Sequence, residues 1–349
     1  MLNGARVPIV IVGYGNPGDI ADCLAALAVA NSGPSFAALI CENGGPAAYE
    51  ALVTRLSACG GPCAGIPEAL DLKTDALTRV ARLRLGQDGP VVLVAEAREN
   101  LGYAGGINAW LAPLGDIAGW EGVWVLNPDT QPEPDALAEL VDYARRHDKG
   151  MVGSRVMYMG NPQIVRSRGL RWRTMAAATL GVDMNAPVLP APDPDDVDRR
   201  IDAPSGASFY VTRPCLERIG LMDERYFLFY EDLDWGLRAK SQGGVGYAYR
   251  SVVPHIGGSS IGSVRSPLER SELAVYLNFR NRLIFVRRHY GGWYIWTAAM
   301  ALVRALEFLA AGAVGNFLVA MRGTYAGLRG ETGRPDHIMA RRIQPSAAP

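Results

Sequence analysis

The sequence predicts an α/β fold in which a Rossmann-like, mostly parallel sheet is flanked by helices and followed by a C-terminal helical extension. Two observations indicate the sheet. Short apolar runs alternate with helical stretches through the first half, and polar or glycine-rich residues directly follow each run. The third observation is that the chain from 271 to 328 has the composition of helices. We therefore expect a ligand site where the parallel strands end.

Four strands and two helices are expected in the first half. The strands are residues 9–12, 36–41, 91–95 and 122–126, and the helices are 20–29 and 132–144. Turns rich in glycine and asparagine follow the strands at 13–18, 42–45, 100–108 and 127–130. Because the carboxyl ends of parallel strands meet at one edge of a sheet, these turns should lie together.

The second half of the chain has a different composition. From residue 151 it is rich in Ser, Arg and aromatic residues, and the Pro- and Asp-rich stretch 183–200 is expected to be a mobile loop that packs no core. We expect an α/β domain over 1–265 in two halves of about 1–130 and 131–265, a helical region over 266–330, and a disordered tail over 331–349.

The apolar stretch 293–321 raises the question of a membrane. Arg304 and Glu307 lie near its middle and Gly312 and Gly315 interrupt it, which favours a packed or interface-lying helical hairpin over a membrane span. A basic cluster precedes the stretch and fits either anionic headgroups or a solvated helix face: Arg280, Arg282, Arg287 and Arg288. Peripheral membrane contact and a homo-oligomer through these helices are both left open.

Composition limits the binding partners and the cellular compartment that we expect for the protein. The 35 basic and 35 acidic residues cancel, so we expect no nucleic-acid partner. Five cysteines without paired Cys-x-x-Cys spacing suit a reducing compartment. Residues 7–12 have the pattern of a first strand and not of a signal peptide. We expect a cytoplasmic protein, or one held peripherally on the cytoplasmic face of the inner membrane.

Asn127-Pro128-Asp129 is the first group of residues that could carry chemistry. A carboxylate at the end of a buried strand, beside a turn made by proline, suits Mg²⁺ or Mn²⁺ that takes its other ligands from a diphosphate. The alternative is structural, because an Asx turn that caps the next helix has the same sequence.

The second group lies in Tyr226–Arg238, where Glu231, Asp232 and Asp234 directly follow an aromatic run. Burial or mutual repulsion should raise the pKa of one of these carboxyl groups, which suits a general base. Asp234 and Arg238 have the spacing of an ion pair within one helix. Glu231 and Asp232, at the start of that helix, are the better candidates for chemistry.

His255 and the glycine-rich turns complete the candidates. His255 follows a strand and precedes a Gly/Ser turn over 257–260, which suits a metal ligand, a phosphate contact or a structural histidine. The segment 100–108 lacks the Gly-x-Gly-x-x-Gly spacing of a dinucleotide-binding helix, and 13–18 has a proline where such a helix would begin. A nicotinamide enzyme is therefore disfavoured.

Taken in order, these segments resemble the family 2 glycosyltransferases, in particular bacterial rhamnosyltransferase-like and galactofuranosyltransferase-like members that build surface polysaccharides. The resemblance extends from about residue 7 to 288. Its elements are Val12-Gly13-Tyr14-Gly15-Asn16, Glu42-Asn43, Asn-Leu-Gly-Tyr-Ala-Gly-Gly-Ile-Asn over 100–108, Leu126-Asn127-Pro128-Asp129-Thr130, and Gly206-Ala207-Ser208-Phe209 leading to Tyr230-Glu231-Asp232-Leu233-Asp234.

The resemblance implies a GT-A type fold and a role for each matching residue. The nucleotide-sugar half would be about 1–130, and the acceptor half about 131–265. Asp129 and His255 would hold the metal, and Asp232, with Glu231 as the alternative, would be the catalytic base. Substrate-binding positions would be Tyr14, Glu42, Asn43, Asn100, Gly102, Gly105, Gly106, Asn108, Asn127 and Trp235.

The implied reaction is an inverting sugar transfer from a UDP- or dTDP-sugar to a hydroxyl of a glycan or lipid-linked glycan, with Mg²⁺ or Mn²⁺. Three residues differ from those usual in the family. Gly15 and Glu42 leave the identity of the nucleotide undecided, and Asn127 gives the metal one carboxylate ligand fewer. Two other functions are considered. A sugar-phosphate nucleotidyltransferase should have a basic residue in the first turn, and 13–18 has none. A non-catalytic sugar-nucleotide-binding protein would not need both Glu231 and Asp232.

Overall fold

The computed structural model describes residues 2–30, 33–72, 74–257 and 266–339. The chain divides into two compact units. The first comprises Met1–Arg171, Leu180–Met222 and Asp232–Gly257, and the second comprises Trp172–Thr179, Asp223–Glu231 and Gly258–Pro349. The second unit thus also includes two segments that lie earlier in the chain, Trp172–Thr179 and Asp223–Glu231.

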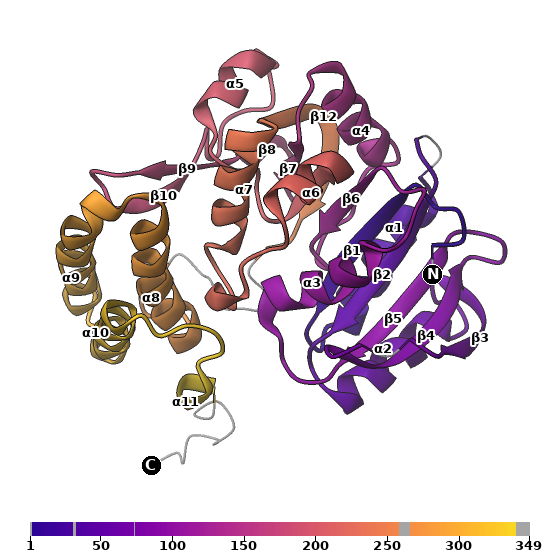
Figure 1. Ribbon diagram of the computed structural model, residues 1–349, viewed down its shortest axis with the longest axis horizontal. Helices are drawn as coiled ribbons and strands as arrows, with labels where there is room; N and C mark the ends of the chain where they lie inside the picture. The colour runs from indigo at the N-terminus through magenta and orange to yellow at the C-terminus, as the bar shows by residue number, and fades with distance from the viewer. Residues whose placement is uncertain (1, 31–32, 73, 258–265, 340–349) are drawn as a thin grey trace. The chain divides into compact units, whose positions relative to one another are not determined.

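A ten-stranded sheet forms the centre of the first unit (Figure 1), in the order β12-β7-β11-β6-β1-β2-β5-β4-β3 with β8 paired to β7. The pairs β1–β2, β1–β6, β2–β5 and β7–β12 are parallel, and the pairs made by β3, β4, β8 and β11 are antiparallel. The sheet is therefore mixed, with a parallel centre formed by the predicted strands, which confirms the predicted fold class. The strands are β1 Val7–Gly13, β2 Phe36–Glu42, β3 Cys63–Leu70, β4 Leu77–Leu85, β5 Val91–Ala97, β6 Gly122–Leu126, β7 Met151–Tyr158, β8 Asn161–Ser167, β11 Ser208–Thr212 and β12 Val245–His255.

Helices cover both faces of this sheet, and the alternation of side chains along the strands explains why. In β1, Val10 packs in one apolar cluster with α3 and α6, whereas Ile9 and Ile11 pack in another with α1, α2 and α4. Both faces are thus apolar, as parallel sheets require. The helices are α1 Pro17–Ala28, α2 Pro46–Ser57, α3 Gly102–Leu114, α4 Ala136–Arg146, α5 Pro194–Arg200, α6 Arg213–Ile219 and α7 Glu231–Gln242.

Two expectations about the first unit need correction. The antiparallel strands β3, at the edge of the sheet, and β4, next to it, are absent from the sequence prediction, because their exposed and half-exposed positions give no continuous apolar run. The stretch 183–200 is not only a loop, since α5 lies within it. Val197 and Asp198 of α5 are buried, and Asp198 accepts hydrogen bonds from the Tyr143 hydroxyl and the Tyr247 backbone N–H.

The second unit is built on three helices, which confirms the expected C-terminal helical region. They are α8 Glu272–His289, α9 Tyr294–Ala310 and α10 Val314–Arg329, and the 3₁₀ helix Gly291–Trp293 lies between α8 and α9. A further 3₁₀ helix, Glu224–Tyr226, and the short hairpin β9 Leu170–Arg173 and β10 Ala178–Gly181 precede them in the chain. Within this unit Phe227, Tyr276, Phe279 and Phe308 belong to one apolar cluster.

Two further expectations concern the second unit. The tail expected over 331–349 is ordered at its start, where Ile338 of α11 Asp336–Met339 is buried, and 340–349 lie outside the described residues. Arg280 and Arg282 are buried rather than free for headgroups. Arg280 donates to the carbonyls of Gly333 and Tyr226, and Arg282 lies 3.3 Å from the Tyr230 hydroxyl.

Candidate active site

Asp129 and His255 form the best-defined pair at the carboxyl edge of the sheet. Asp129 follows β6 and His255 is the last residue of β12, and both side chains are buried. Nε2 of His255 lies 3.1 Å from Oδ1 of Asp129, and the Gly257 backbone N–H donates to Oδ2 at 3.0 Å. The structure thus brings together two predicted metal ligands. The remainder of the expected Gly/Ser turn, 258–260, lies outside the described residues.

The surroundings of Asp129 keep it ionised. Burial alone would raise the pKa of its carboxyl group, but the hydrogen bond and charge of His255 and the Gly257 N–H together lower it below the ordinary value. A carboxylate that stays charged is the form that binds a divalent cation.

The number of protein side chains near Asp129 and His255 that could act as ligands limits how a metal ion could be held. Within the described ranges there is no group of three or more His, Cys, Asp or Glu side chains that could hold one. The 3.1 Å between the facing atoms matches the separation of about 3 Å between adjacent ligands of an octahedral ion with bonds near 2.1 Å. Asp129 and His255 therefore fit two positions around Mg²⁺ or Mn²⁺, with the others left to a diphosphate and water.

Asp232 is connected to the end of β6 through Tyr103 and Gly206. The Tyr103 hydroxyl lies 3.0 Å from Oδ1 of Asn127 and 2.8 Å from the Gly206 carbonyl. A Cβ atom on Gly206 would lie 2.6 Å from Oδ2 of Asp232, so the carboxyl group lies directly against this glycine. The chain of contacts thus runs from Asp232 to Asn127, two residues before Asp129.

The pKa of the Asp232 carboxyl group is raised. Burial raises the pKa of its carboxyl group to about 6, although the Leu233 backbone N–H, 2.7 Å from Oδ1, acts in the opposite direction. A carboxylate with such a pKa is a stronger base than an ordinary aspartate and is still mostly unprotonated at pH 7. Asp234, by contrast, is fully buried and pairs with Arg238 at 3.0 Å, the structural role that the spacing predicts.

The loop before α7 has an unusual backbone. Phe227, Phe229 and Tyr230 all have positive φ angles of 65° to 76°, which cost free energy for residues other than glycine. The buried Asn281 amide holds the loop by donating to the carbonyls of Tyr226, Leu228 and Phe229 at 2.8–2.9 Å. Glu231, the first residue of α7 and the last of its segment in the second unit, is buried as well.

Glu42 and Asn43 act on the loops around the predicted nucleotide site. Oε1 of the fully buried Glu42 accepts from the backbone N–H groups of Gly15 and Gly44, and burial raises the pKa of this carboxyl group. Asn43 donates to the Gly102 carbonyl at 2.9 Å and accepts from the Leu101 N–H. The structure shows these two side chains bonded to the backbone of the turns that follow β1, β2 and β5. Direct contact of Glu42 or Asn43 with a nucleotide therefore remains a prediction.

The other predicted binding residues divide by exposure. Tyr14 is 49% exposed at the end of β1 and is free to meet a base. Trp235 is 0% exposed and its indole N–H donates to the Gly220 carbonyl, so no surface is left for a ligand. Asn108 is buried in a reciprocal pair with the Met222 backbone. Asn100 receives the Gly102 N–H at the start of α3, and Gly105 and Gly106 are buried within that helix.

Tyr103 and Asn281 are missing from the sequence prediction. Tyr103 lies inside the glycine-rich segment 100–108, which was predicted to lie near the donor. Its hydrogen bond to Gly206, however, joins residues 103 positions apart and cannot be read from that segment. Asn281 lies between arginines that suggest a charged helix face. Nothing in the local sequence indicates that this amide holds a loop some 50 residues earlier.

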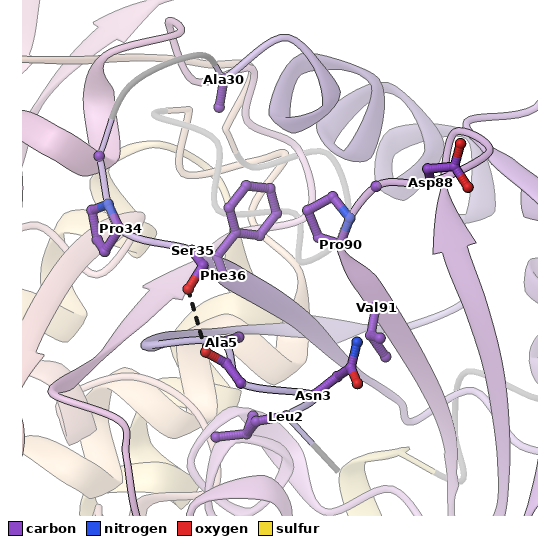
Figure 2. A pocket seen from close by; sticks show the side chains of 13 residues that line it. Leu2, Asn3, Ala5, Ala30, Pro34, Ser35, Phe36, Asp88, Pro90 and Val91 are labelled. Carbon is purple, nitrogen blue, oxygen red and sulfur yellow. Dashed lines mark hydrogen bonds between the residues drawn. The ribbon is translucent and has the colours of Figure 1, made fainter.

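A separate hollow lies away from these residues (Figure 2). It has a volume of about 390 Å³ and lies at the amino ends of β1, β2 and β5, next to Phe36 and Val91. Asp88 is the one ionisable side chain among its lining residues within the described chain. The hollow is thus at the edge of the sheet opposite to Asp129 and carries no group suited to the predicted chemistry.

Comparison with known proteins identifies relatives of the chain. Residues 71–285 match the family described as Glycosyltransferase like family 2. Low-salt glycan biosynthesis hexosyltransferase Agl10 of Haloferax volcanii is 22% identical over 256 residues, 68% of this chain and 76% of that protein. The N-acetylglucosaminyl-diphospho-decaprenol L-rhamnosyltransferase of Mycobacterium tuberculosis is 29% identical over 268 residues, 71% of this chain and 78% of that protein.

Solved structures share the fold at low sequence identity. The mannosyltransferase PcManGT from Pyrobaculum calidifontis, in complex with GDP-Man and Mn²⁺, has a TM-score of 0.50 and 13% identity, covering 95% of this chain and 90% of that one. GalNAc-T7 with UDP, GalNAc and Mn²⁺ has a TM-score of 0.52 and 11% identity, covering 97% and 58%. The predicted GT-A type architecture is therefore confirmed.

The role of Asn281 can be tested by unfolding. Asn281→Ala should lower the free energy of unfolding by about 2–4 kcal/mol, because buried carbonyls of a strained loop lose their donor. Asn278→Ala is the matched control, since Asn278 lies on the same helix and donates to the Ala274 carbonyl one turn earlier. Urea titrations should give it a loss below about 1 kcal/mol. Equal losses for the two variants would show that Asn281 is an ordinary helix residue.

Proposed function

Because this chain belongs to the glycosyltransferases of family 2, we propose that it is an inverting enzyme that moves a sugar from a nucleotide-diphospho-sugar to an acceptor hydroxyl. The observation that carries the proposal is the pairing of Asp129 with His255 at the carboxyl edge of the sheet, with Asp232 connected to the same strand end through Tyr103. A metal-binding pair and a carboxylate with raised pKa are the two parts that the reaction needs.

Asp232 is proposed as the general base. In a single displacement, the acceptor oxygen attacks the anomeric carbon while its proton passes to a carboxylate on the acceptor side. The bond between the sugar and the diphosphate breaks on the opposite face, so the anomeric configuration inverts. Gly206 supports this role, because the absence of a side chain there leaves room for the Asp232 carboxyl group.

Asp129 and His255 are proposed to hold Mg²⁺ or Mn²⁺ together with the donor diphosphate. When bound, the ion offsets the negative charge of the nucleoside diphosphate as it leaves. The protein's part is to keep Asp129 charged and to fix both ligands by backbone contacts, of which the Gly257 N–H is one. The PcManGT complex, which contains Mn²⁺, supports the choice of ion.

The exposed Tyr14 and the turns joined by Glu42 and Asn43 are proposed to receive the nucleotide of a UDP- or dTDP-sugar. The acceptor is proposed to be a glycan or lipid-linked glycan used for a bacterial surface polysaccharide. The name of the mycobacterial relative, an N-acetylglucosaminyl-diphospho-decaprenol rhamnosyltransferase, supports a lipid-linked acceptor. Such a reaction would take place in the cytoplasm, on the cytoplasmic face of the inner membrane.

A panel of sugar nucleotides tests the reaction class. With Mn²⁺ or Mg²⁺ present, at least one donor should release its nucleoside diphosphate, and EDTA should abolish the release. Asp129→Asn should lower it by about a hundredfold or more, since the metal loses its charged protein ligand. Asp135→Asn, at the exposed N-cap of α4, is the control. Metal-dependent release of pyrophosphate from a nucleoside triphosphate would instead identify a nucleotidyltransferase.

Replacement of the proposed base tests its identity. Asp232→Asn should lower turnover by at least about a hundredfold, the usual contribution of a general base, while binding of the donor survives. Titration calorimetry with the nucleoside diphosphate measures the binding separately. If Glu231→Gln abolishes turnover and Asp232→Asn does not, the base is Glu231.

The pH dependence follows from the raised pKa of Asp232. The base must be unprotonated, so kcat/KM should fall about tenfold per pH unit below a pKa near 6 and should level off above it. His255→Gln should lower the rate yet keep this acidic limb. A limb that disappears in His255→Gln, or a rate that stays constant down to pH 4.5, would contradict the assignment to Asp232.

A further inference from the structure

The outward face of α9 reverses the usual pattern of a helix in a water-soluble protein. The buried positions are mostly small, namely Thr297, Ala301 and Ala305, with Phe308 one turn later. The large apolar side chains point outward and are 40–83% exposed; we call these residues the α9 face: Ile295, Trp296, Leu302, Val303, Leu306 and Leu309. A surface helix normally exposes polar side chains on this side. Small residues inside and large apolar residues outside are typical of helices that meet lipid.

The length and composition of the helix agree with this pattern. Gly291–Ala310 is one helical stretch long and apolar enough to cross a membrane, and only 22% of its most apolar window is buried. The exposed Glu307 interrupts the α9 face near its carboxyl end, and Trp293 and Trp296 lie at its amino end. Indole rings prefer the boundary between headgroups and acyl chains. The helix therefore suits a position in the plane of a membrane surface more than a crossing.

Contacts within the second unit tie the polar groups of α9 to the β9–β10 turn. The Trp296 indole N–H donates to the Met175 carbonyl, and the Arg304 guanidinium donates to the Ala176 carbonyl, both at 3.0 Å. Met175 is itself 66% exposed and extends the apolar surface beside Trp296. The turn and the helix thus form one apolar surface, in which the Trp296 indole N–H and the Arg304 guanidinium are bonded to backbone carbonyls of the turn.

The charge of the surrounding helices distinguishes between a membrane and a second copy of the chain. Residues 272–330 contain seven of the 35 basic residues and only two of the 35 acidic ones, so the rest of the chain is acidic. Arg287 and Arg322 are exposed, whereas the exposed Arg288 and Arg329 already pair with Asp223 and Glu331. A symmetric dimer through this face would place like charges together. Anionic headgroups would be attracted by them.

We propose that the α9 face docks the protein peripherally on an anionic lipid bilayer. The apolar side chains enter the boundary of the acyl chains, and the exposed arginines contact phosphate headgroups. This interaction goes beyond sugar transfer and can be measured without turnover, so a failure of one proposal leaves the other standing.

Vesicle flotation with the full-length protein tests the proposal. Vesicles of phosphatidylcholine with 30–40% phosphatidylglycerol, about the range used to mimic anionic membranes, should bind the protein at least about tenfold more strongly than phosphatidylcholine alone. High salt should weaken this binding. Leu302→Ser/Leu306→Ser should lower it by about tenfold or more, because two exposed apolar side chains are lost.

The controls address folding and non-specific adhesion. Ile66→Ser/Met184→Ser removes two apolar side chains from the first unit that are 90% and 51% exposed, and it should float like the wild type. Circular dichroism should show unchanged melting for both double variants.

Three results would overturn the proposal. The first is equal flotation of the wild type and Leu302→Ser/Leu306→Ser. The second is a dimer in solution that this variant dissociates, with no vesicle binding by the wild type, which would assign the face to a second copy. The third is protein that stays in the membrane after carbonate extraction, which would indicate a spanning helix.

Discussion

The contact between Asp129 and His255 is the constraint on which the site depends, because it joins residues 126 positions apart. Backbone bonds surround it on both sides: the Ile256 N–H donates to the Asp129 carbonyl and the Gln131 N–H to the Pro254 carbonyl. The turn after β6 and the end of β12 are therefore held as a short ladder, and the two side chains face one another without depending on flexible loops. This arrangement would pre-organise the two proposed ligands for an ion that also takes the donor diphosphate.

Asp232 depends on support of a different kind. Its place against Gly206 is set by the Tyr103 hydroxyl, which holds the Gly206 carbonyl and Asn127 together. The residues that precede Asp232 are held in left-handed conformations by Asn281. A loop with three such residues persists only when its surroundings compensate for the strain, and strain of this kind is common where a backbone presents a functional side chain. Low solvation then raises the pKa of the carboxyl group.

The sequence predicted the parts of this molecule whose signals are local. Strands β1, β2, β5 and β6 are continuous apolar runs because both faces of the sheet are covered, and Asp129 and His255 stand where such strands end. Strands β3 and β4 and helix α5 were not predicted. Their segments are half-exposed or rich in Pro and Asp, and therefore contain no continuous apolar run. Asn108 lies in a family segment and Trp235 directly follows one, and both were assigned to substrate, whereas burial gives them packing roles. Tyr103 and Asn281 act over distances in sequence that no local pattern reveals.

In the proposed reaction, one displacement accomplishes the transfer, with Asp232 as base and the donor diphosphate leaving from the metal side. The stereochemistry of the product tests this most directly. Proton NMR of the first product formed, recorded before any mutarotation or further reaction, should show an anomeric configuration opposite to that of the donor sugar. A product that retains the donor's configuration would require a second displacement or attack from the leaving-group face, and Asp232 would then have no part as the acceptor's base.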